Sequence, residues 1–286
     1  MYKIIFIDID GTLRNNKKQI SKRCKDAINN LVSNGILVVL TSGRPNTYTE
    51  NISKEVGASR YIISSNGGSI YDYKEKKNLY TNVMNKEEVL KLYNIANNSG
   101  VRFIMNTNTS RVVTKLKHYD GSEIELKEDI ELFVNKNDIT QCVISDQDFY
   151  KMKMVKKEVV KLKDVEIKYQ AKKLLDESEP ITESTTIDIA NINSSKGNAI
   201  KILCTILKID LKDTIAIGDD ANDISMLKTV GYAVAMDNAI NRVKEYADEI
   251  TKSNEEDGVA IFLEKLNRII KEEKNEKYKR NSEEQI

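Results

Sequence analysis

Short, uninterrupted apolar runs recur along this 286-residue chain where strands of a parallel sheet would lie. Parallel strands are covered on both faces, so they read as continuous apolar runs instead of alternating patterns. An amphipathic segment follows Ser21, a favourable helix N-cap residue, and stops at Gly35. The alternation of strand and helix therefore predicts an α/β fold with a parallel sheet. The expected strands of this sheet are 3–8, 36–40, 61–65, 214–218 and 232–236.

A different pattern occupies the middle of the chain, where the expected strands cluster instead of alternating with helices. We expect helices at 85–99, with a capping box from Asn85 to Glu88, and at 147–161. The strands expected there are 101–106, 111–116, 130–134, 139–145, 165–170 and 184–190. We therefore predict a discontinuous Rossmann-like core domain at 1–81 and 189–270, an inserted α+β domain at 82–188, and a charged tail at 271–286. The last helix is expected at 257–270, and the tail beyond it is expected to fray.

Composition narrows the function classes. The net charge is +1, which gives no reason to expect nucleic acid or an acidic membrane as a partner. The apolar runs are too short to span a bilayer, and no obligate protein partner is evident. Cys24, Cys142 and Cys204 are scattered, which suits free thiols in a reducing cytoplasm. His118 is the one histidine, so a zinc site or a Ser-His-Asp triad has almost no material, and carboxylates must do any proton chemistry.

Two acids, Asp8 and Asp10, close the first apolar run and precede Gly11-Thr12. Both side chains point the same way if the strand continues, and like charges that close repel each other. A cation between them, or a reaction that uses them in different roles, would explain the pair. The alternative is an ordinary turn, since Asp and Gly both suit tight turns.

Two further stretches could bind an anion. Thr41-Ser42-Gly43-Arg44 ends a strand and offers a hydroxyl, a backbone N–H and a guanidinium, although an ordinary strand-to-helix turn would look similar. Lys196 stands in the first turn of an expected helix, where its charge opposes the helix dipole. A bound anion would reverse that effect, and the alternative is a solvated surface lysine.

The stretch GDDAND at 218–223 places three acids directly after an apolar strand. Carboxylates at a strand end suit a hard cation that prefers oxygen ligands. The alternative is an acidic helix N-terminus, which would explain Asp223 but explains Asp219 poorly.

In this order, these motifs resemble those of the haloacid dehalogenase superfamily and, within it, the Cof-type sugar-phosphatase branch (subfamily IIB). Further stretches similar to that branch are Ser65-Asn66-Gly67-Gly68, Ala235–Ala239 and Glu256–Val259. The resemblance covers most of residues 1–266. It implies a Mg2+-dependent phosphatase acting on small phosphorylated metabolites, with sugar phosphates as the expected class. It also implies that the inserted domain is a mobile cap that closes over the site and chooses the leaving group.

The resemblance also implies roles for single residues. Asp8 would attack phosphorus and become an aspartyl-phosphate, while Asp10 would protonate the leaving alcohol and then activate water. Mg2+ would be held by the Asp8 carboxylate, the Asp10 main-chain carbonyl and Asp219. The phosphoryl oxygens would be bound by Ser42, the Gly43 N–H, Lys196 and Asn222. Asp223 would orient Lys196 or a metal-bound water.

The roles of two arginines are left undecided. Arg44 would contact the substrate or form a salt bridge to the cap. Arg14 stands where the family often has an apolar or small residue, and we expect it to alter the nearby surface and leave the chemistry in place.

Other functions remain possible. A mutase resembling phosphomannomutase shares the nucleophile motif and would move the phosphoryl group between sugar hydroxyls. A non-catalytic phosphate-binding module is less expected, because every reactive position is filled. A structural cation-binding protein would need the acids but neither Lys196 nor the 41–44 stretch.

Overall fold

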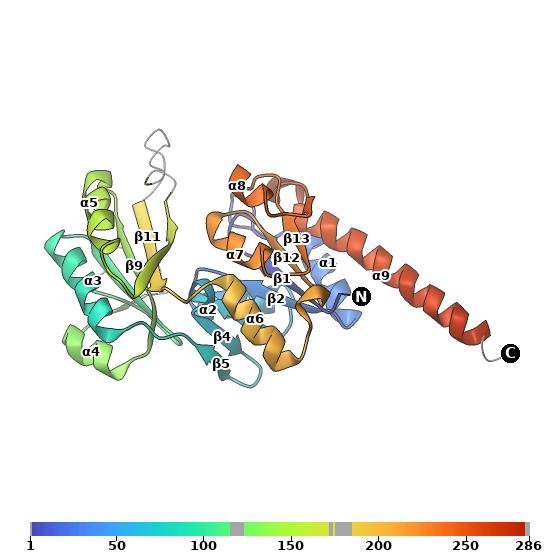
Figure 1. Cartoon of the computed structure of the whole chain (residues 1–286), viewed down its shortest axis with the longest axis horizontal. Coiled ribbons are helices and arrows are strands. Elements are labelled where there is room, and N and C mark those ends of the chain that lie inside the picture. The colour runs from blue at the N-terminus through green and yellow to red at the C-terminus, as the bar shows by residue number, and fades with distance from the viewer. Residues whose placement is uncertain (1, 115–122, 172–173, 175–184, 284–286) are drawn as a thin grey trace. The chain divides into compact units, whose positions relative to one another are not determined.

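The chain folds into two compact units that both mix helices and strands (Figure 1). The computed structural model describes residues 2–114, 123–171, 174 and 185–283. The first unit combines 1–40, 52–60 and 204–286, and the second combines 41–51 and 61–203. The predicted domain boundaries at 81/82 and 188/189 stay predictions, and His118 lies outside the described residues.

A parallel sheet forms the centre of the first unit. Its strand order is β14-β13-β12-β1-β2, and β1, β12, β13 and β14 pair in parallel. Every residue of β1 and β12 is buried, which explains why these segments show no polar alternation. The predicted α/β class with a parallel sheet is therefore confirmed. The bounds are β1 Ile4–Asp8, β2 Leu37–Thr41, β12 Thr214–Gly218, β13 Tyr232–Ala235 and β14 Glu249–Ile250.

The helices of this unit begin much as the sequence predicts. Ser21 caps α1, and its Oγ accepts a hydrogen bond from the backbone N–H of Cys24 at 3.1 Å. The last helix continues to Glu283, so the expected end at residue 270 is too early, and the fraying expected of the tail stays a prediction. Glu and Lys dominate this segment, and both lose little rotamer freedom in a helix. The bounds are α1 Lys22–Ser33, α7 Ile224–Leu227, α8 Asn241–Lys244 and α9 Gly258–Glu283.

The second unit contains an antiparallel β3-β4-β5 meander and a six-stranded sheet. The six-stranded sheet has the order β10-β11-β9-β6-β7-β8, and its pairs are antiparallel except β7 with β8. The meander strands are β3 Tyr61–Ser64, β4 Ser69–Asp72 and β5 Lys77–Thr81. The six strands are β6 Arg102–Thr107, β7 Arg111–Val113, β8 Ile124–Glu125, β9 Ile139–Asp146, β10 Val165–Gln170 and β11 Thr185–Asn191.

Helices α3 Lys86–Asn98, α4 Ile130–Lys136 and α5 Phe149–Val159 all lie on one face of this six-stranded sheet (Figure 1). Alternate strand residues such as Phe103, Ile144 and Ile187 point to these helices and form the core of the unit. The opposite strand face carries Ile104, Val113 and Val143 together with several polar side chains. Two more helices, α2 Asn46–Glu55 and α6 Lys196–Leu207, contribute residues to both units.

Two local predictions in this unit are corrected. Residues 130–134 form helix α4 and not a strand, because Asp129 caps the segment by accepting from the N–H groups of Glu131 and Leu132. Periodicity alone does not separate a short apolar strand from a short buried helix. Asn85 does cap α3, accepting from the N–H of Glu87, but Glu88 instead accepts from Lys91 at 2.7 Å.

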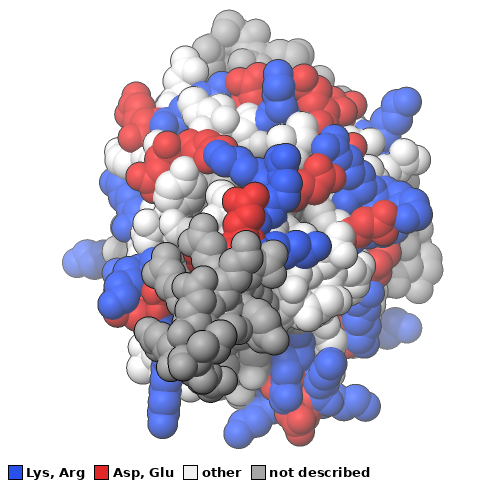
Figure 2. All heavy atoms as spheres, turned by 90° about the vertical axis from the view of Figure 1, so that its right-hand side faces the viewer, with Lys and Arg blue, Asp and Glu red and all other residues white. Residues whose placement is uncertain are grey.

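Charges of both signs are interspersed on the face shown in Figure 2. This mixture is what a net charge of +1 over 31% charged residues would produce. Among the described residues, the helices are all too short or too polar to cross a bilayer.

Candidate active site

The first group of candidate residues lies where two neighbouring parallel strands end. Strand β1 pairs with β12 so that Ile4 stands opposite Thr214 and Ile7 opposite Ile217. Asp8 and Asp219 therefore emerge together at the carboxyl ends of their strands. In α/β proteins this edge of the sheet is where ligands bind.

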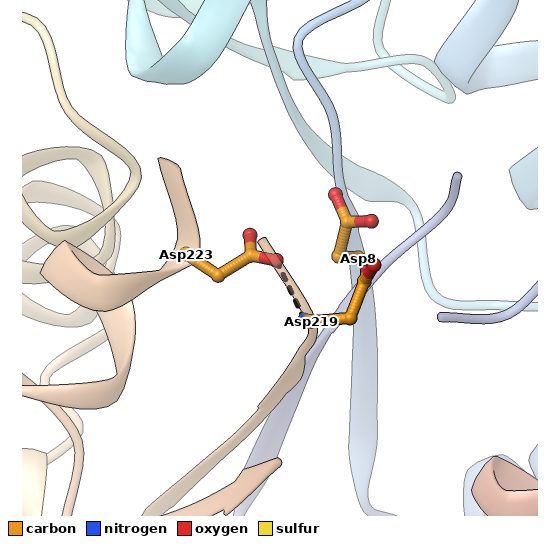
Figure 3. Close-up of side chains that lie close together, drawn as sticks. All are labelled: Asp8, Asp219 and Asp223. Atoms are coloured by element: carbon orange, nitrogen blue, oxygen red, sulfur yellow. Dashed lines mark hydrogen bonds between the residues drawn. The ribbon is translucent and has the colours of Figure 1, made fainter. Parts of the chain in front are cut away.

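Three carboxylates meet at this edge (Figure 3). One oxygen each from Asp8, Asp219 and Asp223 lies within 4.8 Å of the others. Asp8 is 5% exposed and Asp223 is 0% exposed, so water screens their repulsion poorly. An all-oxygen donor set of this kind fits a hard divalent cation such as Mg2+.

Two residues of the DIDGT motif hold Asp219 in place. The Thr12 hydroxyl, buried in the first unit, donates to Asp219 Oδ1 at 2.6 Å. Gly11 has φ +90°, and a Cβ built on it would lie 2.3 Å from Asp219 Oδ2. The Gly11 carbonyl in turn accepts from Asn238 Nδ2 at 2.8 Å. A side chain at position 11 would therefore displace the carboxylate.

Asp223 is fixed by the turn that it caps. Its Oδ2 accepts from the backbone N–H groups of Asp219 at 2.9 Å and Asp220 at 3.1 Å (Figure 3 draws the first of these). The helix-terminus interpretation of Asp223 is thus correct for one of its oxygens, and the same carboxylate also belongs to the acidic cluster. Asn222 lies in the same short turn and is partly exposed.

Asp10 lies beyond the strand, because β1 ends at Asp8. The strand continuation that would align the two side chains is therefore absent. The Asp10 carboxylate is 38% exposed, and its Oδ1 lies 3.8 Å from Arg14 Nη1. Arg14 Nε also donates to the carbonyl of Lys18 at 2.8 Å. Arg14 thus contacts the candidate acid–base group directly, which the sequence did not suggest.

In the second unit, Ser42 and Gly43 follow β2 in a tight loop, in which Ser42 is buried and Gly43 is partly exposed. Ser42 Oγ accepts from the N–H of Arg44 at 3.0 Å, and the Ser42 N–H donates to the carbonyl of Ile63 at 2.9 Å. A Cβ on Gly43 would lie 3.0 Å from Asn66 Nδ2, so glycine permits the close approach of this amide. These two hydrogen bonds fix the position of Ser42 in the loop.

Lys196 is the first residue of α6 and is only 1% exposed, so the surface-lysine alternative is wrong. A buried ammonium is costly unless charged or polar partners surround it. The Ser195 carbonyl at this helix start lies so close to Gly67 that a Cβ there would be 2.1 Å away. The Ser65–Gly68 loop therefore packs against the start of α6, beside Lys196.

Three residues that help to build the site were not predicted as site residues: Thr12, Asn66 and Asn238. All three lie inside motifs quoted for the family resemblance, which is the signal that could have found them. Their contacts join segments far apart in sequence, such as Asn238 with Gly11, and spacing alone does not show these contacts. Whether Ser42, Gly43, Lys196 and Asn222 bind phosphate stays a prediction.

Comparison with known proteins gives a consistent family. Residues 5–263 match the haloacid dehalogenase-like hydrolase family. The chain is 29% identical to a 5-amino-6-(5-phospho-D-ribitylamino)uracil phosphatase of Bacillus subtilis, over 92% of this chain and 98% of that protein. A second Bacillus subtilis phosphatase of the same name is 30% identical, over 90% of this chain and 93% of its own length. A phosphoglycolate phosphatase of Methanobrevibacter smithii is 26% identical, over 92% and 97%.

Comparison with solved structures indicates the same family. A haloacid dehalogenase-like hydrolase from Bacteroides thetaiotaomicron is 29% identical and superposes with a TM-score of 0.76, covering 93% of this chain and all of that one. A subclass IIB sugar phosphatase shares the fold with a TM-score of 0.74 at 20% identity, covering 92% and 98%. The chain therefore belongs to the haloacid dehalogenase-like hydrolase family, and its relatives are phosphatases.

Proposed function

We propose that this hydrolase is a Mg2+-dependent phosphatase that cleaves small phosphomonoesters, with sugar phosphates as its substrates, through an aspartyl-phosphate on Asp8. The observation that carries the proposal is the carboxylate cluster at the ends of β1 and β12. A nucleophilic carboxylate beside an all-oxygen cation site matches what attack on an anionic phosphate ester requires.

Asp8 would attack phosphorus, forming its own O–P bond as the ester O–P bond breaks. Asp10 would give its proton to the departing alcohol oxygen. The same carboxylate would then take a proton from water, whose oxygen attacks phosphorus and releases Asp8 and inorganic phosphate. The exposed position of Asp10 on the turn suits a group that exchanges protons with water.

The other residues would bind and orient. Ser42, the Gly43 N–H, Lys196 and Asn222 would hold the phosphoryl oxygens, because phosphoryl transfer depends mainly on positioning and charge neutralisation. Asp8, Asp219 and the Asp10 main-chain carbonyl would hold Mg2+, with Asp223 at the edge of the same cluster. When bound, the cation would neutralise charge between nucleophile and phosphate.

The inserted domain would act as the mobile cap of the site. The substrate would be a small phosphorylated metabolite, and the protein would work in the cytoplasm. The three free, buried cysteines suit that reducing compartment. The curated relatives named above act on a ribitylaminouracil phosphate or on phosphoglycolate, which supports small phosphate esters as the class.

The test is phosphate release from a panel of small phosphomonoesters, with Mg2+ and with EDTA, by wild type and Asp8→Asn. Asp26→Asn is the matched control, because Asp26 is an exposed aspartate on α1 that forms an ion pair with Lys22, one helical turn away. Turnover should require Mg2+, disappear in Asp8→Asn and persist in Asp26→Asn. Turnover that survives in Asp8→Asn would refute the nucleophile, and activation by a bisphosphorylated sugar with little water turnover would indicate a mutase.

A further inference from the structure

The helix-free face of the six-stranded sheet carries a polar cluster where an apolar one would pack more simply. Asn106 pairs in register with Gln141 of β9 and Arg111 of β7, and Asp188 of β11 pairs with Val143 of β9. Their side chains therefore share one face. Asn106 and Gln141 are both 0% exposed, so this polarity is not a solvated surface.

The amides and guanidinium of this cluster are connected to one another. Asn106 Nδ2 donates to Gln141 Oε1 at 3.2 Å, and Arg111 Nη1 donates to Asn106 Oδ1 at 3.3 Å. Arg111 Nε is already paired with Glu123 at 3.0 Å. Gln141 Nε2 has no hydrogen-bond partner among the described residues. A fully buried donor without an acceptor of good geometry is costly, so a ligand oxygen within reach of this amide would be stabilised.

Asp188 is the half-buried carboxylate of the cluster. Burial raises its pKa to about 6, and Arg111, Arg44 and the amides of Gln141 and Asn66 oppose that rise. The Gln141 amide therefore faces the carboxylate without closing a hydrogen bond of normal geometry. Asp188 keeps accepting capacity that hydroxyl groups could use.

Asn66 joins this cluster to the candidate phosphate loop. Its amide lies against Gly43 on one side and stabilises the Asp188 carboxylate on the other. A small phosphate ester held by Ser42 and Gly43 would thus place its alcohol part toward Asp188 and Gln141.

We propose that Asp188 and Gln141 determine specificity by recognising hydroxyl groups on the alcohol part of the substrate. The inference rests on the proposed phosphatase function. Asp188 accepts hydrogen bonds from neighbouring hydroxyls, and Gln141 Nε2 donates to a hydroxyl oxygen. A carboxylated ester such as phosphoglycolate would instead place a second anion against Asp188, which disfavours it.

The experiment compares ribitol 5-phosphate, phosphoglycolate and p-nitrophenyl phosphate as substrates for wild type, Asp188→Asn and Gln141→Leu. Either variant should lower kcat/KM for ribitol 5-phosphate about tenfold or more, mainly through KM, because binding contacts to hydroxyls are lost. Turnover of p-nitrophenyl phosphate, which has no hydroxyls to recognise, should stay within about twofold and shows that the variants fold. Asp188→Asn should also raise relative activity on phosphoglycolate. Thr186→Val, on the same strand and face, is the matched control.

Calorimetric binding of ribitol 5-phosphate and phosphoglycolate to the same proteins gives a readout that does not need turnover. Unchanged preference between the two esters in Asp188→Asn and Gln141→Leu, by turnover and by binding, would overturn the inference. Absence of wild-type turnover on all three esters would count against the proposed function. A binding preference for the polyol ester that is lost in Asp188→Asn would still support the recognition role.

Discussion

Gly11→Ala is the substitution that probes the candidate metal site most sharply without touching a carboxylate. The new Cβ would lie 2.3 Å from Asp219 Oδ2 and 2.9 Å from its Cγ. The Asp219 carboxylate would have to retreat by about 1 Å to restore ordinary van der Waals separation. The hydrogen bond that the Thr12 hydroxyl donates to the other Asp219 oxygen, 2.6 Å long, would then be lengthened or bent. A misplacement of that size costs about a hundredfold in rate.

Backbone strain accompanies this displacement, because position 11 has φ +90°. Strain of that kind costs about 1–3 kcal/mol of folding stability. Gly35→Ala separates the two effects, since Gly35 has φ +85° and nothing within 4 Å of a built Cβ. Gly35→Ala should therefore lose comparable stability while keeping activity.

The assay measures kcat/KM, the free energy of unfolding, and the rise in thermal midpoint on adding Mg2+. Gly11→Ala should lose about a hundredfold in kcat/KM and most of the Mg2+-dependent stabilisation. Gly35→Ala should lose neither. Equal activity in the two variants would refute the claim that Gly11 is needed to seat Asp219.

Three further substitutions or treatments have definite expected outcomes. Thr12→Val should weaken Mg2+ affinity about tenfold by removing a hydrogen bond to a metal-binding carboxylate, and Thr12→Ser should restore it, measured by calorimetry. Lys196→Met should reduce kcat/KM by about a hundredfold or more and weaken inhibition by inorganic phosphate, because a buried cation is lost. Unchanged inhibition by phosphate would contradict the role of Lys196 in phosphate binding. Burial raises the pKa of the Cys142 thiol and raises that of Cys204 to about 11, so at pH 8 both thiols stay protonated and should react with a thiol reagent only after unfolding. Rapid reaction of the native protein would contradict their burial.

The parallel core could be predicted because its strands are buried on both faces and therefore read as continuous apolar runs. Strand β5 Lys77–Thr81 escaped prediction, since most of its residues are polar and all of them are at least partly exposed. The prediction of a strand at 130–134 was wrong for a different reason. A short apolar run fits either a strand or a helix until a cap such as Asp129 decides between them.

The candidate site likewise contains residues that the sequence could place and residues that it could not. Asp8 and Asp219 could be placed from the strand ends alone, because carboxyl ends of parallel strands share one edge. The burial of Lys196 and the contact of Arg14 with Asp10 could not, since both depend on how distant or looping segments pack. Arg14 shows the limit of motif reasoning, because the departure was visible in the sequence while its partner was not.

The central claim is a phosphorylated Asp8, and acid-quenched turnover of Asp10→Asn tests it most directly. With p-nitrophenyl phosphate, whose leaving group departs without needing a proton from Asp10, this variant should still form the aspartyl-phosphate. Without its base it should hydrolyse that intermediate slowly, so the phosphoryl group accumulates on the protein. Mass spectrometry of the quenched peptides should find that group on Asp8 in Asp10→Asn and on no residue of Asp8→Asn. A phosphoryl group on another residue, or hydrolysis by Asp8→Asn at the wild-type rate, would contradict the account.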